Sequence, residues 1–126
     1  MEDKRLEATA RLLDVMTTLR RECPWDREQT FDSLRSNTIE ETYELADAIT
    51  DHNMEGIKEE LGDLLFAAVK AGRFLHVDSE QALTQACEKF IRRFRAVERL
   101  AQGESLDQME LAQLEELWAR AKQQEG

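Results

Sequence analysis

Apolar side chains recur at helical spacing along nearly the whole chain, and a single proline, Pro24, interrupts them. Spacing of three or four residues is typical of amphipathic α-helices, whereas strands alternate apolar and polar side chains. The chain has only five glycines and a charged fraction of 35%, which favours long, solvated helices. Its 126 residues suffice for one hydrophobic core. We therefore predict an all-α fold of four or five helices in a single domain, residues 1–126.

The apolar pattern predicts where these helices begin and end. They are expected over about 3–21, 39–51, 54–75, 79–101 and 107–122. Pro24 interrupts the pattern after the first helix, because proline lacks an N–H donor and disfavours helix in the preceding residue. Residues 22–37 are then expected to be irregular. Thr38 is the predicted N-cap of the second helix, with Glu41 completing a capping box.

Two acidic clusters, EETYE and EELGD, stand on the second and third predicted helices. Each contains two carboxylates three residues apart, Glu41 with Glu44 and Glu60 with Asp63. Residues at that spacing are neighbours on a helix, with Cβ atoms about 5–6 Å apart. A short turn between the helices would bring both pairs together. Four carboxylates at one point cannot all stay ionised without a cation between them.

The ordinary alternative for these clusters is a solvated acidic face. Glu41 and Glu60 argue against it, because both border an apolar face, where an unpaired charge is costly. We therefore predict a divalent metal site, occupied by Mg²⁺ or Mn²⁺, since all the ligands are hard oxygens. Neither His52 nor His76 completes an ExxH pair, which counts against a di-iron carboxylate bundle.

A cationic pair follows on the fourth predicted helix. Lys89 and Arg93 lie four residues apart and flank the stripe of Phe90 and Phe94. One interpretation is an ordinary basic face that pairs with neighbouring acids. The other is a phosphate clamp, in which arginine makes forked contacts and lysine acts as a point charge.

The two tryptophans also allow two interpretations, a core anchor or a surface for stacking. Trp25 comes before the acidic helix in a segment expected to be irregular, a good location for stacking on a flat ring. Trp118 has Lys122 one turn later, so these two side chains share a helix face.

The net charge of −10 counts against nucleic acid as a partner, because phosphate backbones attract basic surfaces. A polyphosphate ligand would need bridging cations. No apolar stretch is long enough for a membrane span, and no signal peptide is expected at the N-terminus. Cys23 and Cys87 form no CxxC pair and are interpreted as reduced thiols, which predicts a cytoplasmic protein.

Taken together, these segments resemble the MazG family of nucleoside triphosphate pyrophosphohydrolases, part of the all-α NTP pyrophosphatase superfamily. The resemblance rests on segments that occur in the family's order. They are CPWDREQTF from Cys23, EETYE from Glu40, EELGDLLF from Glu59 and KFIRRF from Lys89, followed by Trp118 and Lys122. Well-known bacterial members carry two such domains in tandem. This chain has one, whose beginning resembles their first domain and whose end resembles their second.

The resemblance implies hydrolysis of (deoxy)nucleoside triphosphates to monophosphate and pyrophosphate, as housecleaning of the nucleotide pool. It assigns the metal to four carboxylates, those of Glu41, Glu44, Glu60 and Asp63. It assigns nucleotide contacts to five residues, with Lys89 and Arg93 on the triphosphate, and Trp118, Lys122 and Trp25 near the rest of the nucleotide. The catalytic assignments fall on Glu40, which would hold a metal or orient the attacking water, and on Glu41.

The resemblance also implies a homodimer, or a tetramer of paired dimers, because helices of two chains form the bundle in this family. The apolar third helix fits that expectation. Two alternatives stay open. One is a narrower pyrophosphatase of the same superfamily, acting on dUTP, dCTP or phosphoribosyl-ATP. The other is a non-catalytic helical adaptor whose acidic faces bind a basic partner.

Overall fold

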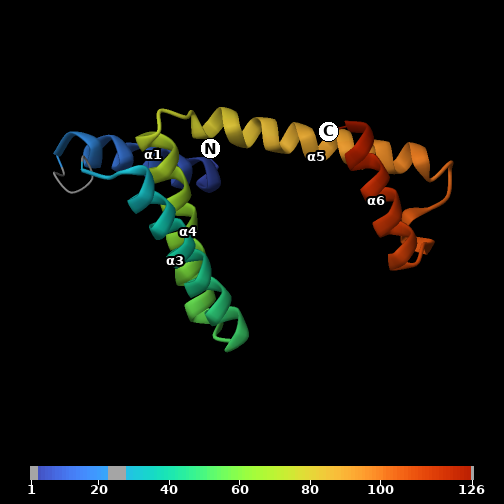
Figure 1. The fold of residues 1–126 in the computed structure, drawn as a ribbon, viewed down its shortest axis with the longest axis horizontal. Helices are drawn as coiled ribbons and strands as arrows, with labels where there is room; N and C mark the ends of the chain where they lie inside the picture. Colours follow the sequence, from blue (N-terminus) through green and yellow to red (C-terminus); the bar gives the residue numbers. More distant parts are fainter. Residues whose placement is uncertain (1–2, 23–27, 126) are drawn as a thin grey trace. The chain divides into compact units, whose positions relative to one another are not determined.

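The computed structural model describes residues 3–22 and 28–125, and the regular structure in these residues is entirely helical. The described residues form five α-helices and one short 3₁₀ helix (Figure 1). They are α1 (Lys4–Glu22), α3 (Phe31–Thr50), α4 (Met54–Phe74), α5 (Ser79–Leu100), η1 (Leu106–Gln108) and α6 (Leu111–Glu125). The predicted all-α class is confirmed. No helix among the described residues is long and apolar enough to cross a membrane.

Helix α3 begins at Phe31, whereas the prediction placed its start near residue 39. Thr30 is the N-cap. Its hydroxyl accepts a hydrogen bond from the Ser33 backbone N–H at 3.1 Å, and the Ser33 hydroxyl accepts one from the Thr30 N–H at 2.8 Å. Thr38 lies inside the helix and donates its hydroxyl to the Leu34 carbonyl at 2.8 Å. The prediction was wrong because serine occupies the place where the usual capping box has Glu or Gln.

Contacts between residues divide the chain into two compact units, Met1–Ser79 and Glu80–Gly126. In the first unit, α3 and α4 form an antiparallel hairpin, and α1 packs against α4 (Figure 1). Asn53 caps α4, with its side-chain oxygen accepting from the Gly56 N–H at 3.0 Å. The Arg73 guanidinium donates to the Thr17 hydroxyl at 2.8 Å and ties α4 to α1. Only residues 51–53 separate α3 from α4, so the short turn predicted between the acidic helices is present.

The first unit buries few large side chains. Its buried hydrophobic residues in the described ranges are Met16, Leu34, Ala48 and Ala67. Several large apolar side chains of the hairpin are exposed instead, namely Ile39, Tyr43, Ile49, Leu61 and Leu65. Exposed apolar surface of this kind is typical of interaction sites.

The second unit is built from α5, η1 and α6. The end of α5 packs against α6 around a small core, which consists of Ala96, Val97, Ala101, Leu117 and Ala121 (Figure 1). Trp118 packs against this core, and the centroid of its ring lies 5.5 Å from that of Phe90. The prediction of a single domain over residues 1–126 stays a prediction.

His52 and His76 end α3 and α4 in the left-handed conformation, with φ values of 54° and 60°. The backbone pattern after α3 is a Schellman motif, in which Asn53 N–H donates to the Ala48 carbonyl at 3.2 Å. A residue with a Cβ pays about 1–2 kcal/mol in this conformation, which glycine avoids. Glycine also loses more backbone entropy on folding, which offsets part of this gain.

We expect His52→Gly to raise the free energy of unfolding by a net amount of about 0.5 kcal/mol, measured by urea denaturation, because the relief of backbone strain exceeds the loss of entropy.

The matched control for this prediction is His52→Ala, which removes the imidazole but keeps the strained backbone. It should not stabilise the chain. A loss of stability in both variants would instead mean that the imidazole makes a contact worth more than the strain.

Candidate functional site

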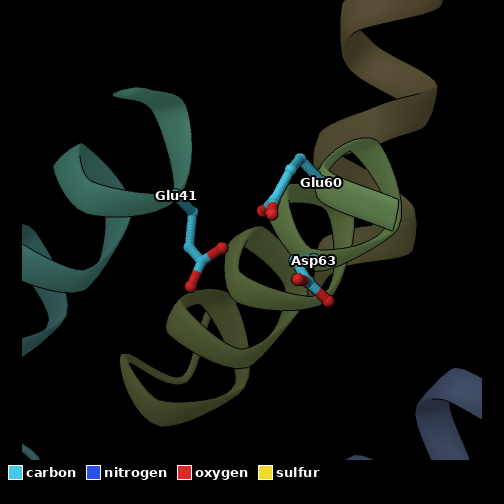
Figure 2. A group of neighbouring side chains, drawn as sticks. All are labelled: Glu41, Glu60 and Asp63. Atoms are coloured by element: carbon cyan, nitrogen blue, oxygen red, sulfur yellow. The ribbon is translucent and has the colours of Figure 1, made fainter. Parts of the chain in front are cut away.

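Three predicted carboxylates converge at one point of the α3–α4 hairpin. Glu41 projects from α3, and Glu60 projects from α4 toward it, with Asp63 near Glu60 on α4 (Figure 2). Each offers a carboxylate oxygen, and these oxygens all lie within 4.8 Å of one another. Glu41 and Glu60 are half-buried, whereas Asp63 is exposed. Three hard oxygens at such distances from two helices match the ligand set that Mg²⁺ and Mn²⁺ prefer.

Glu44 lies beside this group without supplying one of the three converging oxygens. Its carboxyl is close enough to both Glu41 and Glu60 to raise their pKa values. Residue spacing predicted that all four carboxylates would lie together. In the structure, the hairpin brings three of them to a common point and places Glu44 next to Glu41 and Glu60.

Burial is the main cause that raises the pKa of Glu41, followed by repulsion from Glu44, Asp63 and Glu40. Burial also leads in raising the pKa of Glu60, followed by the contact with Glu44. In both residues Oε2 is buried and has no hydrogen-bond partner among the described residues. Leaving a buried carboxylate oxygen unpaired is costly. A divalent cation would satisfy both oxygens and cancel the repulsion, so these donors fit a metal ion of this kind.

The raised pKa values predict a pH dependence for the metal-free protein. Above about pH 4.3, the ordinary value for glutamate, the folded chain holds protons that the unfolded chain has lost. Its stability should therefore fall as pH rises through the folded pKa values of Glu41 and Glu60. Thermal unfolding in EDTA, followed from about pH 5 to about pH 7.5, should show this fall, and Mg²⁺ should offset it at the higher pH.

A comparison of variants isolates this effect from other titrating groups. Glu41→Gln should weaken the dependence of stability on pH, because it removes one of the two glutamates with a raised pKa. Asp47→Asn, at an exposed position on the same helix, should leave the dependence unchanged. An equal dependence in all three proteins would contradict the assignment.

The other predicted site residues of the first unit, Glu40 and Trp25, are not part of the group of three converging carboxylates. Glu40 is exposed and adjoins Glu41 in the chain, and its charge adds to the repulsion on that carboxyl. Trp25 lies outside the described residues. A Cβ at Gly62, between Glu60 and Asp63, would meet nothing within 4 Å among the described residues.

In the second unit, Lys89 and Arg93 lie one turn apart on α5. Lys89 is exposed and Arg93 is half-buried. The Nε of Arg93 is buried and finds no hydrogen-bond partner among the described residues. The rings of Phe90 and Phe94 stack beside them, with centroids 6.3 Å apart and planes 14° apart. A buried guanidinium N–H without an acceptor fits an anionic ligand, because phosphate oxygens would satisfy it.

Trp118 and Lys122 line a pocket of about 500 Å³ between α5, η1 and α6, a volume typical of small-molecule sites. Its full lining is Phe94, Val97, Leu106, Leu111, Leu114, Glu115, Trp118, Ala119 and Lys122. Sequence reasoning found two of these residues as a shared helix face but missed the pocket. The lining residues come from three elements, and the spacing of residues within one helix does not predict how separate elements pack together.

The MazG nucleotide pyrophosphohydrolase domain matches residues 29–97, more than half of the chain. The chain belongs to the MazG family. The match includes both carboxylate pairs and the cationic pair of α5, whereas Trp118 and Lys122 lie beyond it.

Curated MazG relatives are similar over part of their length. The nucleoside triphosphate pyrophosphohydrolase of Escherichia coli K12 is 42% identical over 89 residues, covering 63% of this chain and 34% of that protein. That of Mycolicibacterium smegmatis is 37% identical over 119 residues, covering 89% of this chain and 37% of that protein. The chain thus spans about a third of the length of the curated relatives it matches.

A solved MazG structure shares the fold. The crystal structure of a mazG-related protein from Thermotoga maritima aligns with a TM-score of 0.66 and 28% sequence identity. The alignment covers 90% of this chain and 98% of that one.

Proposed function

We propose that this MazG-family chain hydrolyses nucleoside and deoxynucleoside triphosphates to the monophosphate and pyrophosphate, with Mg²⁺ or Mn²⁺ as cofactor. The observation that carries the proposal is the cluster of Glu41, Glu60 and Asp63, whose oxygens lie within 4.8 Å of one another. Two oxygens of this cluster are buried and have no hydrogen-bond partner in the part of the chain that the structure describes. The names of the curated relatives supply the reaction.

In the proposed reaction, water attacks the α-phosphorus, the bond to the bridging oxygen breaks, and pyrophosphate leaves. Divalent cations supply charge neutralisation and a water of lowered pKa in such chemistry. Glu41, Glu44, Glu60 and Asp63 would bind the cation through their oxygens. Glu40, exposed beside Glu41, would orient the attacking water or hold a second cation.

Lys89 and Arg93 would bind the triphosphate and stabilise the charge that develops on pyrophosphate. The buried Nε of Arg93 supports this role, because it finds no acceptor within residues 3–22 and 28–125. Trp118, Lys122 and Trp25 would contact the rest of the nucleotide. A chain of net charge −10 needs such cations to hold a polyanion.

A screen for pyrophosphate release tests the proposal. Canonical and damaged NTPs and dNTPs, with phosphoribosyl-ATP added, are each incubated with the protein and Mg²⁺. We expect turnover that EDTA abolishes, and turnover of damaged nucleotides would support a housecleaning role in the cytoplasm. Activity on dUTP, dCTP or phosphoribosyl-ATP alone would favour a narrower pyrophosphatase. The absence of turnover on every compound would overturn the proposal.

We also propose that the active form is a homodimer, or a tetramer of paired dimers. The support is the exposed apolar surface of the hairpin, where Tyr43 is 67% exposed and Leu65 is 57% exposed. Helices with such faces are stabilised when a second apolar surface covers them. Light scattering at micromolar concentration should give at least twice the 14.6 kDa of one chain. A stable monomer would contradict this prediction.

A further inference from the structure

The pocket of the second unit has the chemistry of a site for a flat, uncharged ring. Apart from Glu115 and Lys122, its lining side chains are aliphatic or aromatic. Phosphate groups are bound by several cations and backbone N–H groups together, whereas the cationic side chain in this lining is that of Lys122 alone. Nucleobases, in contrast, stack on aromatic side chains, and Trp118 contributes one here. If the proposed function holds, the ring that fits this pocket is the base of the nucleotide.

Glu115 is placed to contact such a ring. It lies on α6 one turn before Trp118 and two turns before Lys122, so the three side chains follow one face of the helix. All three line the pocket. The carboxylate of Glu115 is exposed, and no ion pair or hydrogen bond engages it among the described residues. It is therefore available to a ligand.

An ionised carboxylate only accepts hydrogen bonds, which makes it selective among bases. Guanine presents two donors side by side, the ring N1–H and the N2 amino group, and can bind both carboxylate oxygens. Adenine and cytosine each present one amino group next to an acceptor nitrogen. Uracil and thymine present a single N–H between two carbonyl oxygens, which repel the carboxylate.

We propose that the pocket binds the substrate's base and that Glu115 selects guanine nucleotides by accepting two hydrogen bonds from the base. Glu115 is then a specificity-determining residue, separate from the metal ligands and the phosphate clamp. The inference rests on the proposed function for the identity of the ligand, but its test does not require hydrolysis.

Equilibrium binding of GMP and UMP tests this role, because neither can release pyrophosphate. Calorimetric titrations without metal compare the unaltered chain with Glu115→Ala and Glu116→Ala. Glu116 is the matched control, an exposed glutamate that lines a different groove. We expect the unaltered chain and Glu116→Ala to bind GMP about tenfold more tightly than UMP, and Glu115→Ala to lose this preference. Ala119→Trp, which fills the pocket, should weaken binding of both nucleotides.

Equal binding of GMP and UMP by the unaltered chain, or an unchanged preference in Glu115→Ala, would overturn the inference. So would normal binding by Ala119→Trp. In these cases continued pyrophosphate release would leave the proposed function standing. Conversely, a guanine preference that depends on Glu115, in a chain that hydrolyses no triphosphate, would support the pocket and overturn the proposed function alone.

Discussion

Glu41→Gln is expected to abolish Mg²⁺ binding and at the same time to stabilise the metal-free protein at neutral pH. The substitution removes one of three converging oxygen ligands, so the affinity for the cation should fall below detection by isothermal titration. Pyrophosphate release should fall by about 10²–10³-fold or more, because the cation neutralises the charge that develops in the transition state. Stability should rise because burial and neighbouring charges disfavour the ionised Glu41.

The opposite signs of these two effects distinguish a metal site from a structural role. A glutamate that only supports the fold would lower stability and activity together when changed. Asp63→Asn should also lose metal binding, but with a smaller gain in stability because Asp63 is exposed. Asp47→Asn on α3 is the control and should bind Mg²⁺ as the unaltered chain does. Unchanged Mg²⁺ binding in Glu41→Gln would favour the non-catalytic adaptor.

Arg93→Ala is expected to lower kcat/KM by about 10²-fold while Mg²⁺ binding stays intact. The reason is the buried Nε of Arg93, which has no acceptor among the described residues and would gain one from a phosphate oxygen. Arg93→Lys should not restore activity, since lysine lacks the planar fork. Lys89→Ala should cause a milder loss, as a raised KM or a lowered kcat, because Lys89 is an exposed point charge. Steady-state pyrophosphate release and titration with Mg²⁺ measure the two properties separately.

Arg95→Ala is the matched control for this pair, an exposed arginine on the same helix. It should retain the activity of the unaltered chain. Circular dichroism shows whether each variant remains folded. Loss of helicity in Arg93→Ala would assign Arg93 a structural role, and an unchanged rate in a folded Arg93→Ala would remove it from the proposed clamp.

Local sequence was sufficient for most helices of this chain. Helices α4 and α5 lie close to their predicted ranges, because apolar spacing and the turns at 51–53 and 75–78 are properties of neighbouring residues. The start of α3 was missed because Thr30 and Thr38 are both able to cap a helix. The choice between them depends on the Ser33 hydroxyl, which accepts a hydrogen bond from the Thr30 N–H where the common capping pattern has Glu or Gln.

Sequence alone predicts which carboxylates can meet, since spacing within each helix and a short turn between helices are local features. It could not decide that Glu41, Glu60 and Asp63 share a point while Glu44 lies beside them, because this depends on how α3 and α4 are rotated against each other. The apolar pocket also exists only in the tertiary structure, where α5, η1 and α6 pack together. Glu41 and Glu60 each bury an oxygen that has no hydrogen-bond partner among the described residues, which supports the proposed cation site, and this burial likewise arises only when the hairpin closes.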